Sequence, residues 1–347
     1  MNHQKCKLCL DNDADRVGSH IVPHFLMKRI DNVDKDKGRD KELGFTIGEF
    51  ETTSYFGRSV QPEKINEVIG DITEERIKNN QNPIVTDNLF CSICEQRLSQ
   101  IENEYAKTLE NIEEDSKIDS GFSFLFWASV LWRLSISKNH GLILKGKEEE
   151  RLRRILNNHL REKLDQIDLK ILKGDSDCNG LFYRLIRCPE YSSKAPTFLF
   201  GHPVYCAPYS LIIDEYVLFF YFKKGYVDGL LQSFFGFEMN LRGKPLNHVD
   251  SGETKILYSE KAFSNSLNKL VNNLVDRRMD SYDYILDELH KKLGGKGDSM
   301  PTELKIEIKK EITSGEMKLG ERYTFKQFIM TTYNVLSKYT IKGKPTS

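Results

Sequence analysis

The sequence predicts an α+β protein of two domains, residues 1–115 and 116–347. Three observations support this prediction: two Cys-x-x-Cys pairs that lie about 80 residues apart, a long apolar segment at 122–136, and runs of aromatic and β-branched residues after residue 174. A chain of 347 residues also exceeds the usual size of one domain. We expect short strands and a helix in the first domain, and a mainly helical second domain that contains a β-hairpin or a small antiparallel sheet.

The first domain is expected to contain two short strands and one long helix. Residues 43–47 and 52–56 have the composition of short strands that pair with each other. After the second cysteine pair, Leu98, Ile101 and Tyr105 recur at steps of three and four residues with Glu and Lys between them. This spacing predicts an amphipathic helix that ends near the charged residues before the domain boundary.

The second domain is expected to begin with a buried helix. Residues 122–136 are apolar nearly all round, whereas 148–172 are amphipathic and highly charged. Strands at 209–213 and 216–222 would form a hairpin, because Asp214-Glu215 between them suits a tight turn. Further helices are expected at 260–277, 282–292, 301–312 and 325–338.

The composition is that of an ordinary globular protein, but the charge is unevenly distributed. The net charge is zero, yet residues 1–115 carry 15 Lys and Arg against 23 Asp and Glu, while the remainder carries 36 against 28. Because a nucleic-acid backbone requires local positive surface, such surface should come mainly from the second domain. The start of the chain lacks the apolar core of a secretory signal, and no run reaches the roughly 18 apolar residues of a membrane span. A cytoplasmic location is expected.

Four of the seven cysteines form two Cys-x-x-Cys pairs, and these predict a metal site. A tetrahedral zinc site takes four thiolate or imidazole ligands, and each Cys-x-x-Cys turn supplies two of them. In a chain without a secretory signal, this pattern favours metal ligation over disulfides. The alternative is a set of buried free thiols that happen to fall in pairs. The expected ligands of one structural Zn²⁺ are Cys6, Cys9, Cys91 and Cys94.

Three segments, taken in order, resemble the pattern of the HNH endonuclease family: Cys6-x-x-Cys9, Ser19-His20-Ile21-Val22-Pro23, and Asn88-Leu89-Phe90-Cys91-x-x-Cys94-Glu95. The resemblance covers about residues 5–110 and is closest to a bacterial branch with Ser-His-Ile-x-Pro and Cys-x-x-Cys-Glu motifs. It implies a zinc-stapled ββα-metal domain, similar to a treble clef, that hydrolyses phosphodiester bonds. The implied partner is nucleic acid, with DNA as the first candidate, and the implied setting is anti-phage defence.

The resemblance also implies roles for individual residues. His20 would be the general base, and Glu95 would bind a catalytic Mg²⁺ or Mn²⁺ at a position where the family often has histidine. Glu102 lies two helical turns after Glu95 and would be a second ligand of that ion. Ser19 departs from the pattern, because the family normally has an acidic metal ligand there and a serine binds Mg²⁺ weakly. Two different metals are implied, since four thiolates close the zinc site.

Other interpretations of these residues and of the whole chain remain open. His20 would otherwise pack or form a hydrogen bond beside the zinc, Glu95 would be stabilised by the helix dipole without a catalytic role, and Glu102 would be a solvated carboxylate. The chain would then be an inactive zinc module that binds nucleic acid or a partner protein. A subunit whose acidic N-terminal surface docks on a basic partner is a further alternative, as is a homo-oligomer. The sequence leaves the role of 116–347 undefined.

Overall fold

The computed structural model describes residues 4–27, 43–47, 52–57, 60–63, 65, 80, 85–109, 118–138, 142–191, 199–201, 207–227, 241, 243–319 and 323–341. They form an α+β fold that divides into two compact units. Unit 1 comprises residues 1–37 and 82–267, and unit 2 comprises 38–81 and 268–347. The boundary expected after residue 115 instead lies inside unit 1. The division differs because the N-terminal segment packs against helices that follow it in the chain.

The N-terminal part of unit 1 has the order strand, strand, helix. The buried face of the helix carries Leu98, Ile101 and Tyr105, as their spacing predicted. Residues 110–112, included in the expected helix, lie outside the described residues. The elements of this part are β1 (Ser19–His20), the 3₁₀ helix η1 (His24–Met27), β4 (Val85–Thr86), α3 (Ser92–Ala106) and the 3₁₀ helix η3 (Lys107–Leu109).

The central element of unit 1 is helix α4 (Ser120–Ser137), which confirms the predicted buried helix. Asp119 caps its N-terminus by accepting a hydrogen bond from the backbone N–H of Gly121 at 2.8 Å. Lys138 ends it in a left-handed conformation, with φ of 60°. Helix α4 contacts both α3 and α5 (Gly146–His159), which explains why no domain boundary precedes α4.

The charged segment 148–172 is divided between two α-helices. Helix α5 ends at His159, and Leu160 is extended. The 3₁₀ helix η4 (Leu164–Gln166) follows, and α6 (Leu169–Gly174) then starts anew because Asp168 accepts hydrogen bonds from two backbone N–H groups of its first turn. Asp168 thus fixes where α6 begins.

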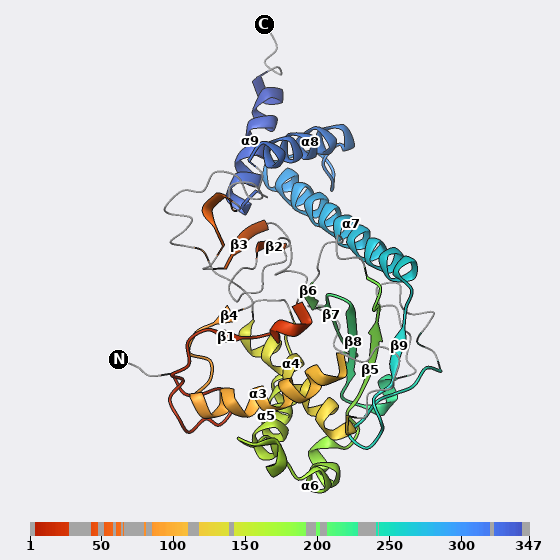
Figure 1. Ribbon diagram of the computed structural model, residues 1–347. Helices are drawn as coiled ribbons and strands as arrows, with labels where there is room; N and C mark the ends of the chain where they lie inside the picture. Colours follow the sequence, from red (N-terminus) through yellow and green to blue (C-terminus); the bar gives the residue numbers. More distant parts are fainter. Residues whose placement is uncertain are drawn as a thin grey trace, which may run out of the picture. The chain divides into compact units, whose positions relative to one another are not determined.

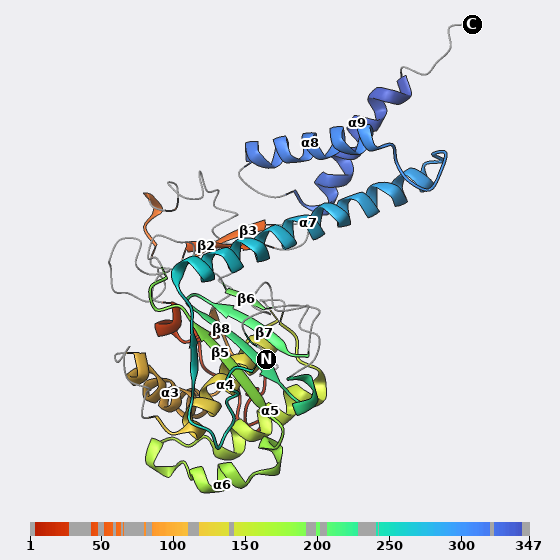
Figure 2. The same cartoon turned by 90° about the vertical axis from the view of Figure 1, so that its right-hand side faces the viewer.

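A five-stranded sheet completes unit 1, with α3 to α6 gathered on one side of it (Figures 1 and 2). The strand order is β6-β7-β8-β5-β9, and β5 pairs with β9 in parallel while the other pairs are antiparallel. The predicted hairpin of β7 and β8 is confirmed, and Asp214 in its turn has a positive φ of 48°. The strands are β5 (Phe182–Arg187), β6 (Leu199–Gly201), β7 (Tyr209–Ile213), β8 (Tyr216–Tyr221) and β9 (Lys255–Leu257).

Unit 2 combines a two-stranded sheet with helices. Strands β2 (Leu43–Ile47) and β3 (Thr52–Phe56) pair in antiparallel register, as predicted. Most of α7 (Glu260–Lys292) belongs to this unit, and it runs without the break expected between 277 and 282, where no Gly or Pro occurs. The other helices are α8 (Thr302–Leu319) and α9 (Phe325–Ile341). Among the residues described in both units, no helix combines the length and apolarity needed to cross a membrane.

Candidate metal centre

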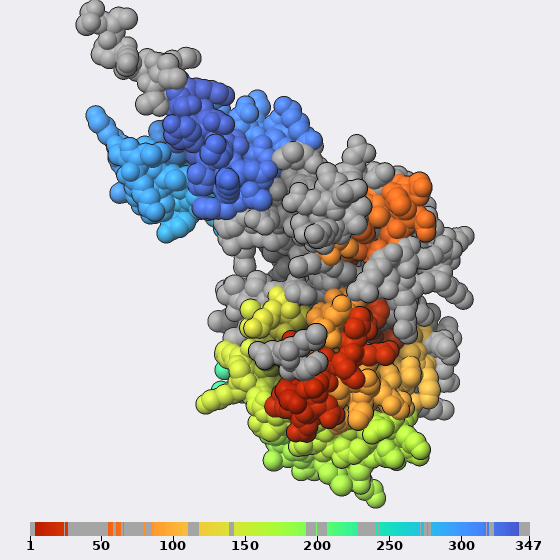
Figure 3. Space-filling model, turned by 90° about the vertical axis from the view of Figure 1, so that its left-hand side faces the viewer, coloured from red at the N-terminus to blue at the C-terminus, as the bar shows by residue number. Residues whose placement is uncertain are grey.

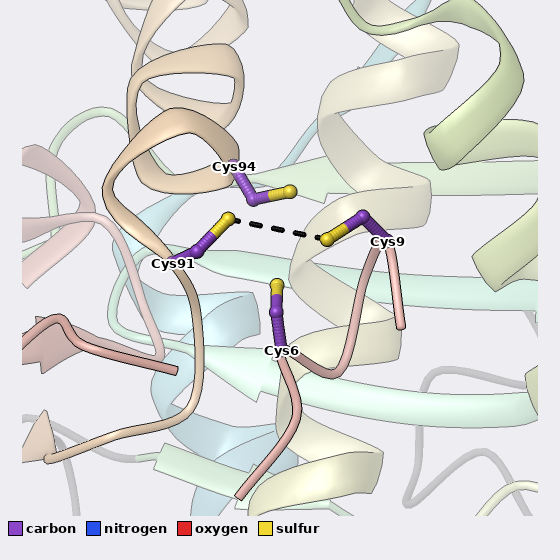
Figure 4. Close-up of side chains that lie close together, drawn as sticks. All are labelled: Cys6, Cys9, Cys91 and Cys94. Carbon is purple, nitrogen blue, oxygen red and sulfur yellow. Dashed lines mark hydrogen bonds between the residues drawn. The ribbon is translucent and has the colours of Figure 1, made fainter. Parts of the chain in front are cut away.

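The first pair of cysteines lies in a tight turn near the N-terminus. The backbone N–H of Cys6 donates to the carbonyl oxygen of Asn12 at 2.9 Å, and that of Leu10 donates to the carbonyl oxygen of Cys6 at 3.0 Å. Leu10 has a positive φ of 65°, which lets the chain reverse directly after Cys9. The turn therefore brings both thiol side chains together (Figure 4).

The second pair lies at the start of α3. Cys91 immediately precedes the helix in an extended conformation, and its carbonyl oxygen accepts the backbone N–H of Glu95 at 3.0 Å. Asp15 caps the helix by accepting the backbone N–H of Ser92 at 2.8 Å. Cys94 follows in the first turn of α3, so the helix start fixes both sulfur atoms of this pair.

The four cysteines converge, and Figure 4 shows their side chains directed toward a common centre. Their Sγ atoms all lie within 4.8 Å of one another, and those of Cys9 and Cys91 are 4.0 Å apart. Sulfur atoms that lie about 2.3 Å from a tetrahedral zinc ion are about 3.8 Å apart, whereas disulfide-bonded sulfurs are about 2.05 Å apart. The spacing suits four ligands around one ion. We refer to these four residues as the cysteine cluster, a candidate metal centre of a kind suited to Zn²⁺.

The burial and the shifted pKa values of the thiols in the cysteine cluster favour the binding of a cation. Cys6, Cys91 and Cys94 are 0%, 3% and 1% exposed. A hydrogen bond with Cys94 lowers the pKa of Cys6 to about 4, and the same contact raises the pKa of Cys94. Burial raises the pKa of Cys91. Buried thiols this close resist joint ionisation, and a divalent cation supplies the positive charge that four thiolates require.

Two polar side chains donate hydrogen bonds toward the sulfur atoms. Asn12 Nδ2 lies 3.6 Å from Cys91 Sγ, and Arg97 Nη1 lies 3.8 Å from Cys94 Sγ. Arg97 Nε also donates to the carbonyl oxygen of Leu160 at 3.0 Å, directly after α5. Such donors orient thiolate ligands and offset the negative charge of a four-thiolate site. The cluster is thereby tied to the helices of unit 1.

A short antiparallel ladder links the cysteine cluster to His20. Near the cluster, the backbone N–H of Arg16 donates to the carbonyl oxygen of Phe90 at 3.1 Å. The backbone N–H of Asn88 donates to the carbonyl oxygen of Arg16 at 2.7 Å. Farther along, β1 pairs with β4 and places His20 opposite Val85. Figure 3 shows the N-terminal segment as red atoms beside the orange atoms of the segment around residues 85–109. The ladder fixes the backbone of His20 relative to the cluster.

The structure also joins the His20 strand to Glu95. The hydroxyl of Ser19 donates to the Glu95 carboxylate at 3.0 Å, across 76 residues of sequence. Burial raises the pKa of the Glu95 carboxyl, while the charge of Arg133 and the hydrogen bond from Ser19 oppose this rise. His20 and Glu95, both predicted from sequence, therefore lie on neighbouring elements, and both side chains are partly buried.

Glu102 forms an ion pair with a residue that the sequence analysis did not single out. Its carboxylate lies 2.6 Å from Arg133 Nη1, and the Arg133 side chain is 3% exposed. The same nitrogen donates to the carbonyl oxygen of His20 at 3.2 Å. The sequence could have indicated that Arg133 has a charged or polar partner, because it is the one charged residue of the apolar segment 122–136 and a buried charge requires a partner.

A second ion, held by Glu95 and Glu102, stays a prediction. Within the residues that the structure describes, the cysteine cluster is the group of three or more His, Cys, Asp or Glu side chains close enough to share one ion. Glu95 and Glu102 are not brought into such a group there. Glu95 accepts a hydrogen bond from Ser19, and Glu102 forms an ion pair with Arg133.

No family model, curated protein or solved structure matches this chain. The function of the chain is therefore inferred from its own residues. These are the cysteine cluster, the strand that carries His20, and the carboxylates of α3.

Proposed function

We propose that this protein is a metal-dependent nuclease with the arrangement of HNH endonucleases, and that it hydrolyses phosphodiester bonds of nucleic acid, with DNA as the first candidate. The order β1, β4, α3 around the cysteine cluster supports a ββα-metal, treble-clef-like assignment for this part of the chain. His20 ends the first strand of that order, and the second cysteine pair opens the helix.

The observation that carries the proposal is the hydrogen bond between Ser19 and Glu95. It joins the strand of the candidate base to the first turn of the helix that holds two of the thiols. Phosphodiester hydrolysis requires a base for the attacking water and an anionic group for a divalent ion, held close together. His20 and Glu95 provide these two groups on elements that contact each other.

Each group has a defined task in this proposal. The imidazole of His20 accepts the proton of a water aimed at phosphorus. Glu95 would hold Mg²⁺ or Mn²⁺, and that ion would supply Lewis-acid stabilisation of the phosphate. The cysteine cluster takes no part in the reaction, because four thiolates leave zinc no open position. A zinc ion held by its four thiolates would keep the strand and the helix in place.

The test is cleavage of plasmid DNA and of RNA with and without Mg²⁺ or Mn²⁺, together with zinc content by mass spectrometry. We expect metal-dependent cleavage by the wild-type protein and a loss of about 10²–10⁴-fold in His20→Ala, with unchanged zinc. His248→Ala removes another histidine of unit 1 and should cleave normally. Equal rates for His20→Ala and wild type would contradict the proposed role of His20.

A second candidate function is a zinc module that binds nucleic acid or a partner protein without cleaving. It is favoured by Ser19 at the position of an acidic ligand and by the pairing of Glu102 with Arg133, which leave one carboxylate for an ion. A pure binder would shift DNA in a gel at low salt and yield no products at any Mn²⁺ concentration. A protein-binding subunit would show neither effect, and would retain another protein through purification.

A further inference from the structure

Arg133 occupies an unusual position for a charged side chain. It is the one charged residue of α4, and its side chain is 3% exposed. Burying an unpaired guanidinium is costly, so its contacts identify what compensates the charge. The nitrogen Nε donates to the carbonyl oxygen of Ser129 at 3.4 Å, and Nη2 donates to the hydroxyl of the same residue at 3.4 Å. Helix α4 therefore holds its own arginine in one orientation.

The remaining nitrogen, Nη1, joins two other elements. It lies 2.6 Å from the Glu102 carboxylate of α3 and 3.2 Å from the backbone carbonyl oxygen of His20 in β1. A guanidinium with these partners and almost no exposure is poorly placed to contact a phosphate itself. Its donated hydrogen bond acts instead on the main chain of the candidate base.

The contact from Arg133 reaches strand β1 at its last residue. The strand spans two residues, and its His20 pairs with Val85 of β4. The contact from Arg133 fixes the carbonyl of His20 where the strand ends. Because Glu102 belongs to the helix that begins at the cysteine cluster, the same ion pair relates His20 to that helix.

We propose that Arg133 is a positioning residue for His20, and that Glu102 acts by holding Arg133 and not as a ligand of the catalytic ion. This inference rests on the nuclease function proposed above. It gives Glu102 a different role from the metal ligand that the resemblance implies. It also accounts for the ion pair between Glu102, which lies on the same side of α3 as Glu95, and the buried guanidinium of Arg133.

The experiment is a double-mutant cycle on the full chain, with Glu102→Gln, Arg133→Gln and the double variant. The measured quantities are kcat for DNA cleavage and the Mn²⁺ concentration that gives half of the maximal rate. Glu104→Gln is the matched control, because it removes a carboxylate two residues away that pairs with the exposed Lys107. Zinc content and circular dichroism establish that each variant is folded.

We expect each single variant to lose about 10–100-fold in kcat, the usual effect of removing a group that orients a catalytic residue. The double variant should be no worse than the poorer single variant, since both changes remove one interaction. The half-saturating Mn²⁺ concentration should stay within about twofold of wild type in all of them. Arg133→Lys should recover much of the loss, because one ammonium group can replace the two contacts of Nη1. Glu104→Gln should match wild type.

Two results would overturn the positioning role. One is an increase of about tenfold or more in the half-saturating Mn²⁺ concentration for Glu102→Gln but not for Arg133→Gln, which is the behaviour of a metal ligand. The other is multiplicative losses in the double variant, which would mean that the two residues act independently.

A readout without catalysis separates this inference from the proposed function. Hydrogen exchange of backbone amides should accelerate in peptides that cover residues 16–26 in Arg133→Gln, and not in Glu104→Gln. If the wild-type protein cleaves nothing, the nuclease proposal fails, while the exchange result still tests whether Arg133 positions the backbone of His20. Unchanged exchange in a cleaving enzyme would refute the positioning role of Arg133 and leave the nuclease proposal standing.

Discussion

Two regions of unit 1 are stabilised in contrasting ways. The region around the cysteine cluster is built from turns, a two-residue strand pair and four thiols. The region between α4 and the sheet is an aromatic core in which the rings of Trp127 and Tyr216 lie 5.7 Å apart and those of Phe124 and Phe220 lie 6.3 Å apart. The stability of the first region is expected to depend on a bound metal ion, whereas the second region is stabilised by the packing of its own side chains.

The second region also compensates its own buried charge. The Glu253 side chain is fully buried and accepts hydrogen bonds from Tyr105 at 2.8 Å, Tyr183 at 2.9 Å and Trp127 at 3.1 Å. Burial raises the pKa of both tyrosines, so they remain protonated donors. Lys255 lies 3.6 Å away and supplies the opposite charge. We therefore expect removal of the metal to destabilise the region around the cysteine cluster. Truncation of core side chains should instead destabilise the region between α4 and the sheet.

The largest effect is expected for Cys94→Ser. Loss of one ligand should forfeit much of the roughly 10–16 kcal/mol that structural zinc contributes in small peptides, and residues 4–27 should lose protection from hydrogen exchange. The strands of the five-stranded sheet should keep theirs. Cys178→Ser, a buried cysteine outside the cluster, is the matched control and should retain zinc. Uniform loss of protection across unit 1 would show that the two regions are not separate in stability.

Glu253→Ala tests the second region and should lower the free energy of unfolding by on the order of 4 kcal/mol, because it leaves buried donors and a nearby lysine without their acceptor. Urea denaturation followed by tryptophan fluorescence measures it. Zinc content in the folded protein should equal that of the wild type. A loss below about 1 kcal/mol would mean that the buried carboxylate is not needed.

Leu286→Ala extends the comparison to unit 2, which contains no cysteine. Leu286 is 0% exposed in a core with Tyr282, Ile308, Ile312 and Phe328. Truncation should cost on the order of 3 kcal/mol through lost burial and a cavity. Hydrogen exchange of α8 and α9 should be faster in the variant than in the wild type. The increase should be equal in zinc-loaded and chelator-treated protein. A chelator-dependent cost would tie this core to the metal.

Asp175→Asn should have the smallest effect, about 1–2 kcal/mol at pH 7. Burial opposes ionisation of Asp175, but hydrogen bonds with His159 at 2.6 Å and from the Asp177 backbone N–H at 2.8 Å outweigh it and lower the pKa of Asp175. Because the folded-state pKa is depressed, this stabilisation is present above about pH 4 and is lost as the pH falls through the folded-state value. The difference from wild type, measured by urea denaturation, should therefore shrink below about pH 4. A difference that grows on acidification would contradict the assignment.

Local chemistry could be predicted from the sequence better than long-range contacts. The cysteine spacing predicted the cluster, and the apolar run predicted α4. The hydrogen bond from Ser19 to Glu95 spans 76 residues and left no periodic signal, and the partner of Arg133 depends on how α3 packs on α4. The short strand β9 and the parallel pairing with β5 were missed because three residues carry little pattern.

The domain boundary was misplaced for a related reason. Charged residues near 115 suggested a linker, but an apolar helix that follows such a stretch can pack back on the preceding segment, as α4 does on α3. Composition detects where a chain is polar, not which surfaces its apolar helices cover. Units made of separated segments, such as 1–37 with 82–267, are therefore the hardest to predict.

An X-ray absorption spectrum at the zinc edge, recorded on the purified full chain with its metal content determined, would show whether the cysteine cluster binds zinc. We expect one zinc per chain with four sulfur neighbours at about 2.3 Å. A first shell of nitrogen or oxygen near 2.0 Å, or a folded protein with far less than one zinc per chain, would contradict it.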